Sequence, residues 1–66
     1  MPDAFPCYVI GDVVSCEGRS ATGPDALKRV CQHMLQDGFP PDTGLAIREQ
    51  PYGPVVRAVL IGAEAS

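Results

Sequence analysis

Three cysteines and one histidine are the side chains in this sequence best suited to metal binding or nucleophilic chemistry. A zinc site built from Cys7, Cys16, Cys31 and His33 is one interpretation, but no C-x-x-C is present and the spacings match no standard ligand pattern. Disulfides are not expected in a cytosolic protein, and an odd number of cysteines cannot pair completely within one chain. We therefore predict Cys31 as a core residue of a helix face, Cys7 and Cys16 as strand residues, and no metal or cofactor.

His33 is the candidate general base. A base needs a nucleophile within hydrogen-bond reach and an acid that orients it. Asp37 lies one helical turn away and would serve as that acid, but Cys31 points to the opposite side of the helix and no serine has a G-x-S-x-G context. The pattern favours a solvent-facing histidine and a protein that is not an enzyme.

The acidic residues Asp12, Glu17 and Glu49 are the candidates for paired carboxylates, because they could approach one another across the sheet, but the sequence does not establish that they do. Eight acids against five bases give a net charge of −3 without a basic stripe, so direct nucleic-acid binding is not expected. The glycines form no phosphate-binding loop. Surface solubility explains the three acids, which also become candidates for pairing with a basic partner.

Residues 55–61 are the most informative segment, because they predict a strand that is apolar on both faces. Val56, Ala58 and Leu60 would lie on one face, and Val55, Val59 and Ile61 on the other, with Arg57 as the exception. Such strands are normally covered above and below. One helix cannot cover both faces, so we predict that a partner covers the second.

The hairpin before this strand contributes further candidate contacts. Tyr52 is either an interface residue flanked by Arg48 and Arg57 or a turn residue that lies across the sheet edge, and both interpretations stay open. The predicted partner-binding residues share exposure on the sheet or at its turns: Val55, Arg57, Val59, Ile61, Tyr52, Arg48, Glu49, Asp12 and Glu17.

The element that positions these strands is a helix after Thr22. Thr22 is the predicted N-cap, with Pro24 in the first turn and Asp25 as the capping-box acid. An apolar stripe follows at the spacing of one helix face, formed by Leu27, Val30, Cys31, Met34 and Leu35. Gly38 predicts a left-handed C′ residue, after which Phe39 folds back onto Met34.

The remaining segments predict strands. Residues 7–17 form a first strand region in which Gly11-Asp12 is either a bulge, which we favour, or a tight hairpin turn. Residues 45–49 form a second strand, and the turn 51–54 leads into the third. The order is β-α-β-β, an α+β fold with a three-stranded mixed sheet of order 1-3-2 and one helix on one face. Residues 1–66 form a single domain, with loosely ordered termini at 1–6 and 62–66.

Length and composition support a small globular protein. At 66 residues, with 45% hydrophobic and 20% charged residues, the chain is ordered but needs a staple, a metal or a partner for stability. No segment resembles a signal peptide or an apolar membrane span, so we expect a cytoplasmic protein that contacts no membrane.

One segment resembles small phage and prophage proteins, a class that includes anti-CRISPR proteins. It spans Ala26 to Ile47, an apolar-striped helix, then Asp37-Gly38-Phe39-Pro40-Pro41-Asp42, then a strand. The resemblance implies a phage-encoded inhibitor that blocks a bacterial nucleic-acid-binding complex in the host cytoplasm. Our leading hypothesis is a non-enzymatic protein-binding module that acts through its exposed sheet face, either on another protein or as a homodimer. The alternative is a self-assembling structural or small-ligand-binding oligomer with sheets packed face to face.

Overall fold

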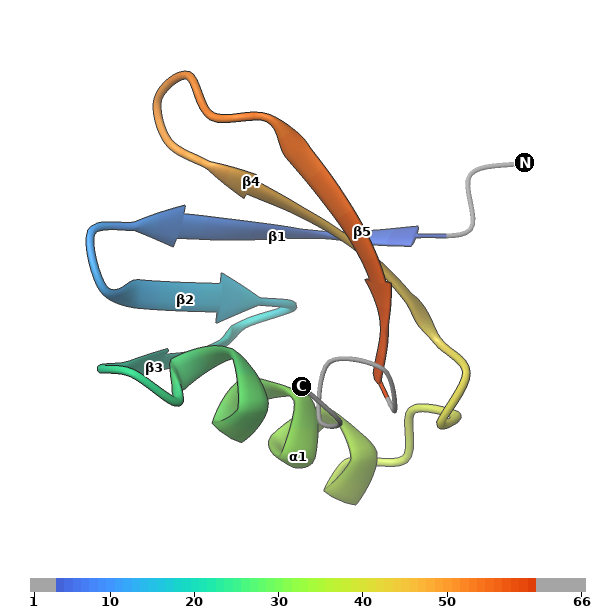
Figure 1. Cartoon of the computed structure of the whole chain (residues 1–66). Coiled ribbons are helices and arrows are strands. Elements are labelled where there is room, and N and C mark those ends of the chain that lie inside the picture. Colours follow the sequence, from blue (N-terminus) through green and yellow to red (C-terminus); the bar gives the residue numbers. More distant parts are fainter. Residues whose placement is uncertain (1–3, 61–66) are drawn as a thin grey trace.

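A computed structural model of the chain describes residues 4–60, which fold into a five-stranded sheet with one helix (Figure 1). The elements are β1 (Ala4–Ile10), β2 (Val13–Cys16), β3 (Arg19–Thr22), α1 (Ala26–Gln36), β4 (Gly44–Glu49) and β5 (Val55–Val59). The sheet is mixed and has the order β3-β2-β1-β4-β5. The predicted three-stranded sheet of order 1-3-2 is therefore wrong, although the fold is a small α+β domain with one helix on one face.

Two short hairpins account for the extra strands. Gly11-Asp12 joins β1 to β2 as a two-residue turn, with Ile10 opposite Val13 and a positive φ of 62° at Gly11. Glu17-Gly18 joins β2 to β3, and both of its residues have positive φ, as a type I′ turn requires. The favoured bulge in a single strand over residues 7–17 is thus wrong. Four-residue strands are stable here because β1 and α1 support them.

The last strand, β5, lies at an edge of the sheet, whereas the sequence predicts a central position for it. β1 pairs directly with β4 in parallel, from Ala4 opposite Gly44 to Val9 opposite Glu49. β5 folds back antiparallel on the other side of β4. The predicted strand directions are correct, but β4 occupies the place assigned to β5, because β1 and β5 pair with opposite sides of β4.

Helix α1 confirms the predicted apolar stripe and the predicted ending. Val30, Cys31 and Met34 are fully buried. At the end of the helix, Gly38 has φ of 104°, its N–H donates to the Leu35 carbonyl, and the Phe39 N–H donates to the Met34 carbonyl, which is a Schellman motif. The beginning differs from the prediction: Asp25 is the N-cap, without a side-chain capping bond, because Thr22 belongs to β3.

The core lies between α1 and one face of the sheet, and a disulfide joins β1 to β2 within it. Cys7 and Cys16 are directly opposite each other in the ladder, with Cα atoms 4.4 Å apart, and both are buried. The expectation that the chain would lack disulfides is therefore wrong. The bond uses two of the three sulfurs that the zinc interpretation needed as thiolates. The buried apolar residues are Cys7, Val14, Cys16, Ala26, Val30, Cys31, Met34, Leu45, Ile47 and Leu60.

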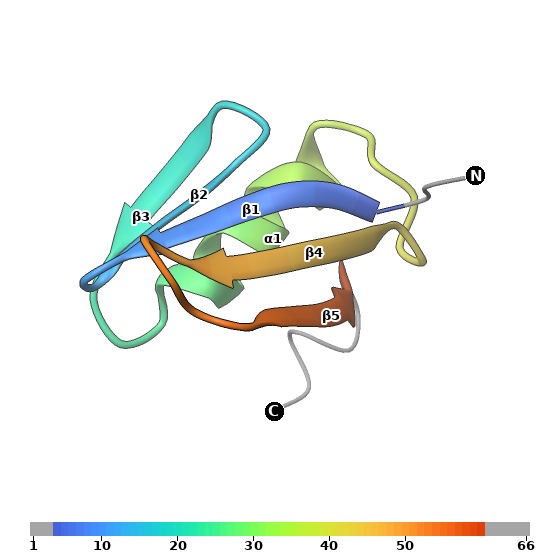
Figure 2. The same cartoon turned by 90° about the horizontal axis from the view of Figure 1, so that it is seen from above.

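The opposite face of the sheet has no layer over it among residues 4–60. Figure 2 views the sheet from this uncovered side, with α1 behind β1 and β4. Ala4 to Pro6, expected in a loose lead-in, belong to β1. Residues 1–3 and 61–66 lie outside the described residues, and so does the predicted contact residue Ile61.

Candidate functional site

The uncovered side of the sheet, which we call the outer face, is built by alternation along each strand. In β4, Leu45 and Ile47 point into the core, so Ala46 and Arg48 point outward. The strand register extends this assignment across the sheet. The outer face consists of Ala4, Pro6, Tyr8, Ile10, Val13, Ser15, Ser20, Thr22, Gly44, Ala46, Arg48, Val55, Arg57 and Val59.

Large apolar side chains of the outer face remain exposed. Val55 and Val59 are 41% and 43% exposed, Ile10 is 64% exposed, and Tyr8 is exposed as well. Tyr8, Arg48 and Val55 occupy one row across β1, β4 and β5. Several large apolar side chains on one sheet face, interspersed with polar groups, are typical of a protein-binding surface.

The charge of the outer face is positive, although the whole chain is acidic. Arg48 and Arg57 lie on it, and the described residues place no Asp or Glu there. Arg57 lies opposite Ala46 in the ladder, and Arg48 lies opposite Val55. An apolar face with two guanidinium groups suits a partner surface that carries carboxylates.

The predicted acidic contacts lie away from this face. Asp12 is in the β1–β2 turn, and Glu49 points to the α1 side at the end of β4. Glu17 is in the β2–β3 turn, at the opposite end of the four-residue strand β2. The fold therefore gathers Val55, Arg57, Val59 and Arg48 on one surface but does not add the three acids to it.

Tyr8 and Ile10 belong to the outer face but were absent from the predicted contacts. The signal that identifies them is the alternation of Cys7, Val9 and Tyr8, Ile10 along β1. The alternation can be assigned to the two faces of the sheet only when one residue of β1 is known to point into the core. The burial of Cys7 supplies that assignment.

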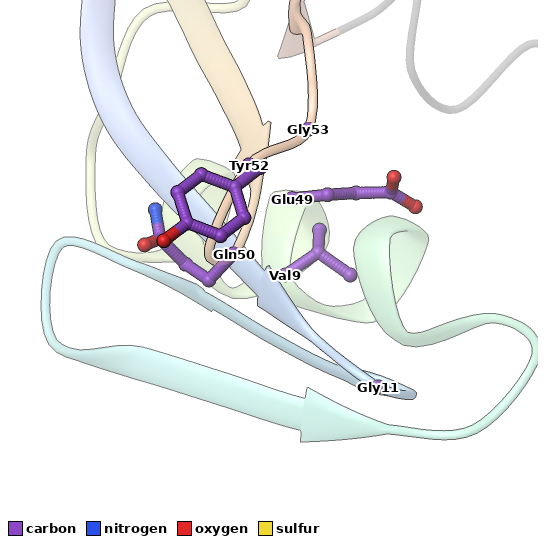
Figure 3. A pocket seen from close by; sticks show the side chains of 6 residues that line it. All are labelled: Val9, Gly11, Glu49, Gln50, Tyr52 and Gly53. Atoms are coloured by element: carbon purple, nitrogen blue, oxygen red, sulfur yellow. The ribbon is translucent and has the colours of Figure 1, made fainter.

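A pocket of about 450 Å³ lies where β1 and β4 end, at the base of the β4–β5 loop (Figure 3). Its lining is Val9, Gly11, Glu49, Gln50, Tyr52 and Gly53. The side chains of Tyr52 and Gln50 lie together on one side in Figure 3, and the Glu49 carboxylate points away from them. The pocket thus offers one carboxylate, one amide and one phenol that do not converge on a common point.

The loop over this pocket is tightly built. Gly53 donates its N–H to the Glu49 carbonyl at 2.8 Å, and a Cβ at residue 53 would lie 2.3 Å from the Cβ of Glu49. Tyr52 beside it is 93% exposed, so its ring does not lie across the sheet edge as the turn-residue interpretation requires. The loop therefore presents Tyr52 to solvent at the end of the sheet.

A second hollow of about 340 Å³ opens on the α1 side of the same sheet end, and it is more apolar. It is lined by Val9, Leu27, Ile47, Glu49, Pro54 and Val56. Glu49 borders both hollows. Among the described residues that line the two hollows, Glu49 is the one carboxylate, and neither lining includes a Ser, Cys, His or Lys side chain.

The other candidate chemistry of the sequence lies elsewhere on the molecule. His33 is exposed on α1, as predicted. Residues 4–60 contain no grouping of three or more His, Cys, Asp and Glu side chains that would hold a metal ion. Nor does this part of the chain contain a helix with the length and apolar character needed to cross a bilayer.

Comparisons with known proteins add no relative: no family model, curated protein or solved structure matches the chain.

Proposed function

We propose that this chain is a non-enzymatic protein-binding module that acts through its outer face. The observation that carries the proposal is the exposure of Val55, Val59, Tyr8 and Ile10 on one sheet face that residues 4–60 leave uncovered. Covering these four side chains would remove apolar surface from water at about 25 cal/mol per Å². A partner that docks on the outer face therefore gains binding free energy from the burial of these side chains.

The partner that this face favours is a protein surface with apolar and acidic residues. Arg48 and Arg57 would pair with its carboxylates, while Asp12, Glu17 and Glu49 lie off the face. The resemblance of residues 26–47 to phage-encoded inhibitors gives the proposal a narrower form. In that form the chain is an anti-CRISPR-like protein that occupies a subunit-docking surface of a bacterial nucleic-acid-binding complex.

Self-assembly with sheets face to face is disfavoured by the same charges. A second copy stacked on the outer face would bring Arg48 and Arg57 of the two copies toward one another. Within residues 4–60, the outer face carries no carboxylate that could pair with them. Burying cations without a counter-charge is costly. We therefore propose a different protein as the partner.

A cytoplasmic location is part of the proposal, and the Cys7–Cys16 disulfide weighs against it. The cytoplasm keeps most thiols reduced. In that compartment the domain must either shield the buried bond from reduction or remain folded without it.

The experiment that tests the proposal uses two matched valines of β5. Val59→Asp places a charge on the outer face, whereas Val56→Asp places the same charge on the α1 side, where Val56 is 56% exposed. We expect Val59→Asp to weaken partner binding by at least about 30-fold, because a hot-spot contact is worth roughly 2 kcal/mol or more, and Val56→Asp to leave binding within about threefold.

Wild type, Val59→Asp and Val56→Asp are each immobilised and used to capture a partner from bacterial lysate. Titration calorimetry then measures the affinity of the purified partner for each of the three proteins. Thermal melting of both variants shows whether they stay folded. A partner that binds Val59→Asp and wild type equally, or the absence of any partner lost specifically with Val59→Asp, would contradict the proposal.

A further inference from the structure

We propose that the edge of β5 that no other strand within residues 4–60 occupies, here called the open edge, binds an extended segment of the partner as a sixth strand, with an acidic side chain opposite Arg57 and apolar side chains opposite Val55 and Val59. This inference rests on the proposed function and specifies the chemistry of the partner. It depends on three observations: the direction of the backbone groups of β5, the lack of protection at this edge, and the charge at its centre.

The backbone direction follows from one hydrogen bond and the register. The Leu60 N–H donates to the Thr43 carbonyl at 3.1 Å, one step beyond the pair Gly44 and Val59. In an antiparallel ladder, hydrogen-bonded and non-hydrogen-bonded pairs alternate. Val56 and Ala58 therefore bond to β4 as Leu60 does, and the N–H and C=O groups of Val55, Arg57 and Val59 point to the open edge.

This edge lacks the features that usually prevent pairing. Protected edge strands carry prolines, bulges or several charges. β5 pairs with β4 over five consecutive residues without a bulge, and its proline, Pro54, precedes the strand. The other edge strand, β3, has only four residues and lies close to α1 (Figure 1). β5 is thus the edge suited to strand addition.

The side chains of the same three residues set the specificity. Val55, Arg57 and Val59 all lie on the outer face, so a strand paired with them places alternate side chains directly opposite. Arg57 has Ala46 opposite it on the β4 side, which supplies no carboxylate. The favoured segment therefore has apolar residues at its first and fifth positions and an acidic residue at its third, and its second and fourth positions accept any residue.

A second copy of β5 fits this edge poorly. The antiparallel register that pairs all five residues of β5 with a copy of itself puts Arg57 opposite Arg57 of that copy. Like charges directly opposite each other destabilise a strand pair. An acidic segment of another protein avoids this repulsion and replaces it with an attraction.

The test uses synthetic peptides and backbone amide exchange measured by NMR. One peptide contains Val-Thr-Glu-Thr-Val, the second has Lys in place of Glu, and a third is the Glu peptide with N-methyl groups at the amides of Val, Glu and Val. We expect the Glu peptide to slow exchange at Val55, Arg57 and Val59 and to bind at least about threefold more tightly than the Lys peptide. The N-methyl peptide should not bind, since its edge-facing donors are removed.

A charge reversal provides the matched control. Arg57→Glu should invert the preference, so that the Lys peptide binds more tightly than the Glu peptide. Arg48→Glu lies on the same face but two strands from the added one, so it should leave the preference unchanged, because screening weakens charges at that distance.

Three results would overturn the inference. They are unchanged exchange at residues 55, 57 and 59 with the Glu peptide, equal binding of the N-methyl peptide, and slowing that grows with protein concentration in the absence of peptide. The last would identify a second copy as the occupant. A natural partner that is lost with Val59→Asp but retained with Val56→Asp would still support the proposed function, so the two failures are distinguishable.

Discussion

Leu45→Ala is expected to remove a large share of the protein's free energy of unfolding. Leu45 is fully buried in β4, the strand between β1 and β5, with Phe5 on one side and Ala58 on the other. Truncating a buried leucine costs about 2–5 kcal/mol. A chain of this size has about 3–10 kcal/mol of total stability at the usual value per residue.

Urea denaturation followed by circular dichroism measures this effect. The control is Val56→Ala, which removes two methyl groups from the same sheet face at a position that is 56% exposed. We expect the control to cost less than about 1 kcal/mol. Equal losses for the two variants would mean that the core does not lie between α1 and this face.

Removing the disulfide is expected to lower the free energy of unfolding by about 2–3 kcal/mol, the chain-entropy value for a loop of this length. The bond closes a loop with a sequence separation of 9, between two residues of the core. In a domain this small, that loss corresponds to a melting temperature lower by on the order of 10 °C.

The measurement is thermal melting of wild type and of Cys7→Ala/Cys16→Ala, each with and without reductant. Reductant should lower the wild-type melting temperature and leave that of the double variant unchanged. If reductant has no effect on wild type, the two sulfurs do not stabilise the fold as a covalent pair.

The helix and the strands β4 and β5 could be located along the sequence because their signals are local. The stripe from Leu27 to Leu35 fixes the buried side of α1, and Gly38 ends it with the expected geometry. The alternation of Leu45 and Ile47 identifies the buried face of β4. These signals arise within single elements, so no tertiary information is needed to interpret them.

The hairpins β1–β2 and β2–β3 could not be predicted from the sequence, because their stability depends on contacts with other elements. Strands of four residues are marginal alone, and β2 and β3 depend on β1, α1 and the Cys7–Cys16 bond. Pro6 also indicated a loose lead-in. It is accommodated in β1 because the ladder with β2 begins only at Cys7.

The position of β5 was mispredicted because apolarity on both faces does not require a central strand. Ala58 and Leu60 pack toward the core, while Val55 and Val59 lie on the outer face. For the same reason the candidate contacts were only partly correct. Three described residues of β5 and Arg48 form one surface, but the acids occupy turns and strand ends that only the three-dimensional fold defines.

Docking at β5 requires that one edge of this strand, unpaired within residues 4–60, is available in solution, and amide hydrogen exchange in dilute, isolated protein measures this. We expect an alternating pattern, with fast exchange at Val55, Arg57 and Val59 and slow exchange at Val56, Ala58 and Leu60. Uniformly slow exchange across all six amides would contradict it, because the edge would then already be paired.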